Sequence, residues 1–137
     1  MSPRATAFDR ERQARILIVE DEPMIAMSLE DLLVEQGFEV AGVVGKLEKA
    51  LALIESAACD AAIIDANLGG VSVRPAASAL AARGVPFMVM SGYTPEQLRG
   101  DFPGALFIQK PSRPEQIVEA LSAMLLNAKI NGKSEAE

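Results

Sequence analysis

Near its N-terminal end the chain reads RILIVEDEP (residues 15–23), an aliphatic run that passes directly into three acidic residues and a proline. The aliphatic part is short and almost free of polar side chains, which is typical of a strand buried on both faces of a parallel sheet. The acidic part begins where that strand ends. Because parallel strands are joined by crossover helices, this segment predicts an α/β fold with charged residues at the C-terminal edge of its sheet.

Two later apolar runs also end in a charged residue. Asp65 follows AAII, and Lys110 follows LFIQ. The C-terminal ends of parallel strands lie on one edge of a sheet, so we expect Asp65 and Lys110 to converge with the acidic residues after the first strand. Two carboxylates about 4 Å apart repel by roughly 4 kcal/mol at an effective dielectric constant of about 20, so such a cluster needs a cation. Lys110 and Mg²⁺ are the candidates, and the arrangement suits a transferred phosphoryl group.

The composition limits the number of domains and the class of fold. With 137 residues, of which 50% are hydrophobic, the chain has the length and apolar content of one domain with a sizeable core. Its two ends, residues 1–13 and 127–137, are polar and lack periodicity. We expect a disordered N-terminal tail and a flexible C-terminal tail around one domain at residues 14–126.

The composition also argues against several functions. Thirteen Lys and Arg against 19 Asp and Glu give a net charge of −6, which leaves no positive surplus for binding nucleic acid. The chain has no His, which excludes His-based triads and most zinc sites. The single Cys59 excludes an internal disulfide and fits a reducing compartment. No apolar run is long enough for a membrane span or a signal peptide, so we expect a cytoplasmic protein without membrane contact.

Strand-like and helix-like patterns alternate along the chain. The expected strands cover residues 15–19, 39–44, 61–65, 86–91 and 105–109. Apolar residues at helical spacing lie between them, and the last helix begins near Pro114. After the fourth strand, a capping-box pattern at Thr94 is followed by Gly100 and Pro103, which leave room for only a short fourth helix.

This alternation predicts a flavodoxin-like parallel sheet in the order 2-1-3-4-5, with helices on both faces. In that order the ligand crevice lies between strands one and three, which end in Glu20-Asp21 and in Asp65. Topology and charge therefore indicate the same edge. The pair Gly69-Gly70 lacks the spacing of a P-loop or a dinucleotide fingerprint, and we expect it to be only a flexible loop.

Each charged position also has an ordinary structural explanation. Taken by themselves, Asp21 and Glu22 also suit a cap at the start of the following helix and a favourable interaction with its dipole. Asp65 is costly to bury after two isoleucines unless it is paired, although a solvated loop position would also satisfy it. Lys110 is also consistent with an ordinary surface lysine. Ser91 is consistent either with a hydroxyl that binds phosphate or with an ordinary serine at the end of a strand. Only their convergence would favour the functional interpretation.

With these residues in place, the chain resembles the receiver domain of bacterial two-component response regulators, a CheY-like fold, from residue 15 to about residue 126. The resemblance implies an acidic pair, a phosphoacceptor, a switch hydroxyl and a lysine with its usually cis proline. These roles fall, in that order, on Glu20 and Asp21, on Asp65, on Ser91, and on Lys110 and Pro111.

The same resemblance implies a divalent cofactor, Mg²⁺ with Mn²⁺ as an alternative. Its ligand positions match Glu20, Asp21, Asp65 and the backbone carbonyl of Asn67. The aromatic switch position of the family falls on Phe107, and Tyr93 is a second candidate.

The chain is also similar to a single-domain alphaproteobacterial subgroup named for a Phe-Ala-Thr-Gly-Tyr-like motif. The similarity lies in the segments PF at residue 86, DANLG at residue 65 and SGY at residue 91. The chain departs from the motif with VMS at residues 89–91, and Ser112 stands where Phe is common. These departures concern the switch and leave the phosphoacceptor in place.

The resemblance implies a stand-alone response regulator that accepts a phosphoryl group from a sensor histidine kinase onto Asp65. It would catalyse only its own phosphorylation and dephosphorylation, as a monomer or weak dimer. Because no second domain follows, we expect it to act on an unknown downstream protein or as a phosphate sink.

Two alternatives stay open. A haloacid-dehalogenase-like phosphatase also uses an aspartyl nucleophile, but it needs an Asp where Asn67 stands and an acidic pair after the lysine. A pseudo-receiver adaptor would fold alike without taking phosphate, and the intact acidic pair argues against it.

Overall fold

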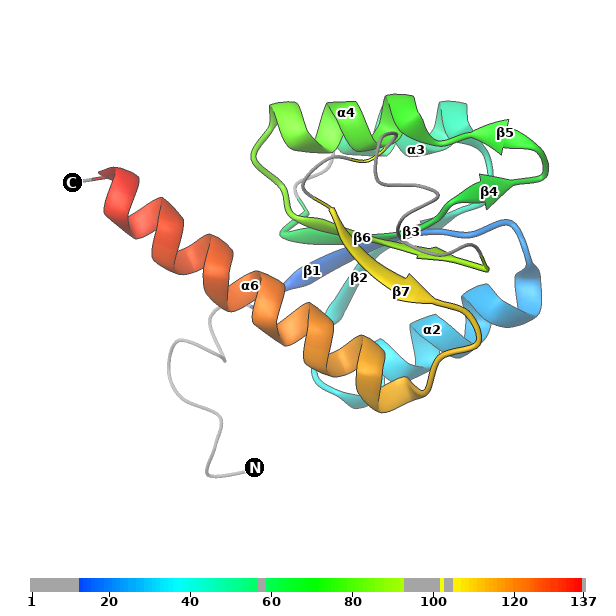
Figure 1. Cartoon of the computed structure of the whole chain (residues 1–137), viewed down its shortest axis with the longest axis horizontal. Helices are drawn as coiled ribbons and strands as arrows, with labels where there is room; N and C mark the ends of the chain where they lie inside the picture. Colours follow the sequence, from blue (N-terminus) through cyan, green and yellow to red (C-terminus); the bar gives the residue numbers. More distant parts are fainter. Residues whose placement is uncertain (1–12, 57–58, 93–101, 103–104, 137) are drawn as a thin grey trace.

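The computed structural model describes residues 13–56, 59–92, 102 and 105–136, the last eight of these by their backbone alone. Five parallel strands form one sheet in the order β2-β1-β3-β6-β7. They are β1 (Arg15–Val19), β2 (Glu39–Val44), β3 (Ala61–Asp65), β6 (Phe87–Ser91) and β7 (Leu106–Gln109). Numbered along the chain, this order is 2-1-3-4-5, so the expected flavodoxin-like fold is confirmed (Figure 1).

Helices cover both faces of the sheet (Figure 1). One face packs against α2 (Pro23–Glu35) and α6 (Pro114–Ala136), and the other packs against α3 (Leu47–Ser56) and α4 (Arg74–Ala82). The side chains of a strand alternate between its two faces, so Ile16 and Ile18 of β1 join the first core while Leu17 and Val19 join the second. This explains why β1 is apolar at consecutive positions.

The register of the strands fixes where the functional side chains lie. Val19 of β1 pairs with Ile64 of β3, so the residues that follow each of them meet at the same edge. On its other side β3 pairs Asp65 with Met90 of β6, and β6 pairs Ser91 with Gln109 of β7. The strand ends thus form one row along the C-terminal edge of the sheet.

The segment after β3 corrects one sequence-based expectation. Gly69 and Gly70 do not form an irregular loop, because they connect β4 (Asn67–Leu68) to β5 (Val71–Ser72) in an antiparallel hairpin. Their φ angles of 55° and 88° are those of a type I′ turn. Glycine adopts both angles without steric cost, and its turn matches the twist of the two strands.

The last helix is longer than expected. It continues beyond residue 126 to Ala136, through a segment that contains no proline and several good helix formers. The expected N-terminal tail, apart from Gln13, and the short helix expected after Thr94 lie outside the described residues. Along the part of the chain that the structure describes, no helix combines the length and apolar character needed to cross a membrane.

Candidate functional site

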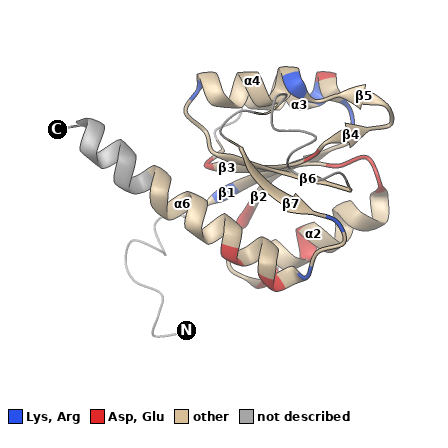
Figure 2. Ribbon diagram, viewed as in Figure 1, with Lys and Arg blue, Asp and Glu red and all other residues tan. Residues whose placement is uncertain are grey.

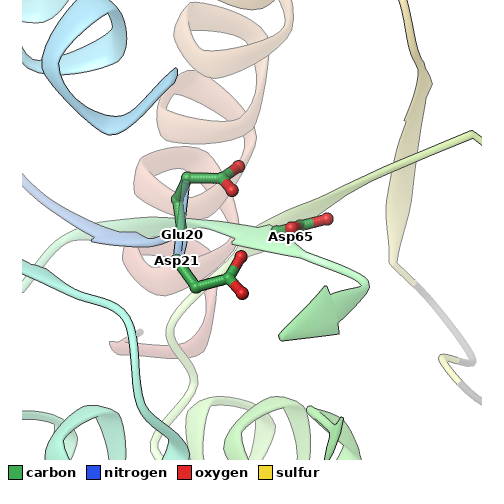
Figure 3. Close-up of side chains that lie close together, drawn as sticks. All are labelled: Glu20, Asp21 and Asp65. Atoms are coloured by element: carbon green, nitrogen blue, oxygen red, sulfur yellow. The ribbon is translucent and has the colours of Figure 1, made fainter. Parts of the chain in front are cut away.

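Three carboxylates meet at the C-terminal edge of the sheet (Figure 3). Glu20 and Asp21 directly follow β1, and Asp65 is the last residue of β3. One oxygen from each lies within 4.8 Å of the others. Glu20 and Asp65 are only 4% and 8% exposed, whereas Asp21 is exposed to solvent. The structure therefore brings together the three acidic residues whose convergence the sequence predicts.

Glu20 is held in an unfavourable environment for a charge. Its backbone N–H continues the sheet by donating to the carbonyl of Val44 at 2.9 Å, and this bond keeps the residue at the buried edge. Burial raises the pKa of its carboxyl group, and the negative charge of Asp65 raises it further. The N–H of Glu22, which donates to Glu20 Oε2 at 3.1 Å, and the ammonium of Lys110 act in the opposite direction.

Lys110 supplies the positive charge of the site. Its Nζ donates to Asp65 Oδ1 at 3.2 Å and lies 3.7 Å from Glu20 Oε1. The backbone N–H of Lys110 donates to the carbonyl of Ser91 at 2.7 Å, which extends the β6–β7 ladder by one residue. The peptide bond between Lys110 and Pro111 is cis. Figure 2 shows acidic and basic residues together at this end of the sheet.

The donor set fits Mg²⁺. Every donor in the cluster is a carboxylate oxygen, the kind of ligand that a hard divalent cation prefers. Among the residues that the structure describes, one ammonium against three carboxylates leaves the cluster negatively charged, so a cation would lower its electrostatic energy. Asn67, whose carbonyl is the fourth expected ligand, begins β4 two residues after Asp65.

The other expected site residues surround this cluster. Ser91 ends β6, is 4% exposed, and lies between the strand of Asp65 and that of Lys110. Phe107 is half-buried on β7, and its ring contacts Phe102 edge to face at 6.4 Å between centroids. Phe107 thus packs with the core on the α3 and α4 face. Tyr93, the second aromatic candidate, lies outside the described residues.

Asn67 makes two contacts that link the site to the hairpin. Its backbone N–H donates to Asp65 Oδ1 at 3.4 Å. Its side-chain Oδ1 accepts a hydrogen bond from the N–H of Gly70 at 2.6 Å. The side chain of Asn67 is therefore engaged with the β4–β5 turn.

Two glycines of the site were missed by reasoning from charge. A Cβ at Gly45 would lie 3.1 Å from Cα of Asp21 and 3.3 Å from the carbonyl oxygen of Glu20, so the loop after β2 approaches the acidic segment closely. A Cβ at Gly69 would lie 3.4 Å from Asp21 Oδ2. A glycine directly after a strand at this edge is a signal of close approach, and Gly45 follows Val44 in that way.

A hollow of about 650 Å³ adjoins the site between α2 and the start of α6. Most of its lining is apolar and includes Met24, Ile25 and Leu29 of α2 with Ile117 of α6. Lys110 also lines it, so the hollow and the acidic cluster share one side chain. No pattern in the sequence indicates this hollow.

Known proteins resemble this chain over the elements just described. A family model for the response regulator receiver domain matches residues 16–122. The transcriptional regulatory protein PdtaR of Mycobacterium tuberculosis is 30% identical over 125 residues, which cover 88% of this chain and 61% of that protein. The chain thus spans less than two thirds of the length of this relative.

Solved structures are also similar to this chain. SdrG from Sphingomonas melonis Fr1 is 42% identical with a TM-score of 0.71, over 82% of this chain and 97% of that one. The receiver domain of the response regulator PhyR from Erythrobacter litoralis is 28% identical with a TM-score of 0.75, over 85% and 93%. The residues matched by the family model run from β1 into α6 and include the whole acidic cluster and Lys110.

Proposed function

The chain belongs to the response regulator receiver domain family, and from this premise we propose that it accepts a phosphoryl group on Asp65 from the phosphohistidine of a sensor histidine kinase. The observation that carries the proposal is the contact between Lys110 and Asp65 inside a cluster of three carboxylates. A buried aspartate with an ammonium beside it and further oxygen ligands around it suits an acceptor of a phosphoryl group. On this proposal the chain works in the cytoplasm, where the ATP that feeds a histidine kinase is found.

Glu20, Asp21, Asp65 and the carbonyl of Asn67 are the residues that would hold Mg²⁺, or Mn²⁺ in its place. The bound cation would neutralise negative charge on the carboxylates and on the phosphoryl oxygens. An oxygen of Asp65 attacks phosphorus, a new O–P bond forms, and the P–N bond to the imidazole of the kinase breaks. The imidazole nitrogen leaves with the bonding electrons, and an acyl phosphate remains on Asp65. Lys110 then donates to an oxygen of the transferred group, and so does the hydroxyl of Ser91.

The acyl phosphate would act as a switch through the residues beside it. Its negative charge draws the hydroxyl of Ser91 inward, and Phe107 or Tyr93 fills the space that Ser91 leaves. The surface around β7 would change as a result. The output is then a protein–protein interaction that depends on phosphorylation, or the chain serves as a phosphate sink that needs no such partner.

Mass spectrometry after treatment with acetyl phosphate and Mg²⁺ tests the proposal. We expect one added phosphate on the wild type and none on Asp65→Asn, which lacks the nucleophilic oxygen. Asp31→Asn, which changes an exposed aspartate on α2 in the same way, is the matched control and should take phosphate like the wild type. Undiminished phosphate on Asp65→Asn would refute the assignment.

Two further results would favour the alternatives. Rapid multi-turnover hydrolysis of small phosphomonoesters by the wild type would favour the phosphatase. Beryllofluoride mimics the acyl phosphate, and a ligand that binds only the folded state raises the melting temperature. No added phosphate and no rise with beryllofluoride at millimolar Mg²⁺ would favour the adaptor.

A further inference from the structure

The β4–β5 hairpin donates a hydrogen bond to one of the three carboxylates and lies close to a second. On one side, the backbone N–H of Asn67 donates to Asp65 Oδ1 at 3.4 Å. On the other side, the turn approaches Asp21 so closely that a Cβ at Gly69 would lie 3.4 Å from Asp21 Oδ2. A shift of the hairpin would therefore change the surroundings of both carboxylates.

Three features hold this small hairpin in shape. The Oδ1 of Asn67 accepts from the N–H of Gly70 across the turn at 2.6 Å. The positive φ angles of Gly69 and Gly70 give the turn its type I′ form. Leu68, which is 4% exposed, anchors β4 in the core on the α3 and α4 face. Only the last of these is an apolar contact. The conformation of the turn at Gly69-Gly70 therefore depends on the hydrogen bond from Gly70 to Asn67 and on the two glycines.

We infer that Asn67 and Gly70 are positioning residues, which hold the hairpin so that Asp65 and Asp21 are set apart at the spacing a divalent cation needs. The inference rests on the proposed function and extends it, because it assigns a role to the Asn67 side chain and to the turn. The side chain of Asn67 acts through the N–H of Gly70, and the hairpin acts through the two carboxylates. Neither group needs to touch the transferred phosphate.

Asn67→Ala gives the direct test, because it removes the acceptor of the turn and keeps the backbone. We expect the dissociation constant for Mg²⁺, measured by calorimetry on the unphosphorylated protein, to rise between about threefold and tenfold, as for the loss of one hydrogen bond. The phosphorylation rate from acetyl phosphate should recover at saturating Mg²⁺. Hydrogen exchange of the Gly70 amide, followed by NMR without metal, should become faster than in the wild type.

Gly70→Ala tests the turn itself and has a matched control. Gly70 and Gly84 both have positive φ, of 88° and 72°, and a Cβ at either would meet no atom of the described residues within 4 Å. Alanine should therefore impose similar backbone strain at the two positions. Gly84 follows α4 and has no part in the acidic cluster. We expect both variants to have a lower melting temperature than the wild type, but only Gly70→Ala to bind Mg²⁺ more weakly.

The possible outcomes distinguish a failure of the hairpin inference from a failure of the proposed function. If the wild type binds Mg²⁺ and takes phosphate while Asn67→Ala binds Mg²⁺ with unchanged affinity, the hairpin inference is wrong and the proposed function stands. Equal weakening in Gly70→Ala and Gly84→Ala would likewise overturn it, because the effect would then be general destabilisation. A wild type that takes no phosphate contradicts the proposed function itself. Should Gly70→Ala fail to fold, Asn67→Ala, with its exposed side chain, still decides the matter.

Discussion

Folding disfavours the charged form of Glu20. Its carboxylate is almost fully buried and lies near Asp65, and its pKa is raised from the ordinary value of 4.5. Lys110 at 3.7 Å and the N–H of Glu22 offset only part of this cost. The metal-free site is thus built at the expense of stability, as is common where function requires clustered charges.

We expect Glu20→Gln to stabilise the metal-free protein relative to the wild type as the pH rises. Because the folded-state pKa of Glu20 lies above 4.5, the folded wild type binds more protons than the unfolded chain between pH 4.5 and that raised value. The contribution of Glu20 to the free energy of unfolding therefore falls with rising pH in this window, and the uncharged glutamine avoids the loss.

Melting temperatures in EDTA from about pH 4.5 to pH 7.5 measure this difference. Glu30→Gln, an exposed residue of α2, controls for the removal of one negative charge. A gap between Glu20→Gln and the wild type that stays constant across the whole range would contradict the prediction. In the presence of Mg²⁺ the sign should reverse, because the variant has lost a candidate metal ligand.

At the scale of single elements, α2 carries both a buried face and an exposed apolar one. Leu29 and Leu33 pack under the sheet, whereas Met24 and Met27 are 77% and 62% exposed. Met24 also lines the hollow that reaches Lys110. On the proposed function a protein donor has to bring its phosphohistidine to Asp65, and we propose that it docks along this hollow.

We expect Met24→Glu to slow phosphoryl transfer from the cognate kinase by about threefold to tenfold, because it places a charge in an apolar contact. Transfer from acetyl phosphate should be unchanged, since a small donor needs no docking surface. Met27→Glu, on the same helix but outside the lining of the hollow, is the matched control. Phosphotransfer profiling identifies the kinase for this comparison, and equal rates for all three proteins would exclude the hollow as its docking site.

At the scale of the whole molecule, the sheet separates two cores, each closed by its own pair of helices. The core under α6 includes Ile117, Leu121 and Met124, whereas Leu126 is 59% exposed. The helix itself continues to Ala136 (Figure 1). We therefore propose that the folded unit ends near residue 126, although the helix does not.

We expect a chain that ends after Leu126 to melt within about 3 °C of the full-length protein, because its removed residues follow Met124, the last buried side chain among those of the helix that the structure describes. A chain that ends after Ala120 also loses Leu121 and Met124, and it should unfold without a cooperative transition. Differential scanning calorimetry measures both. A large loss of stability in the longer chain would show that residues 127–137 belong to the folded unit.

The sequence predicted the sheet and most of the acidic site for one physical reason. In β1, β3 and β7 an apolar run meets a charged residue, Glu20, Asp65 or Lys110, at the point where the strand leaves the core. Such a boundary is visible locally, and the topology of parallel strands then places the three together. These local boundaries and the strand order were therefore sufficient to predict the sheet and most of the acidic site.

Other features depend on tertiary contacts that no local pattern reveals. Gly69-Gly70 suits a flexible loop or a hairpin, and the pairing of Asn67 with Ser72 decides between them. The approach of Gly45 to Asp21 requires β1 and β2 to be in register. The length of α6 was underestimated because exposed polar residues carry only weak helix propensity.

Asp65 meets Lys110 and the Asn67 amide through the same oxygen, Oδ1. In a free peptide the two oxygens of an aspartate exchange places by rotation about χ2, whose wells are broad and two-fold. In the folded chain that half-turn would break both hydrogen bonds at once, so the two oxygens are no longer equivalent. A substituent on Oδ2 would keep this torsion and both bonds, so the orientation of the Asp65 carboxylate is set before any reactant arrives.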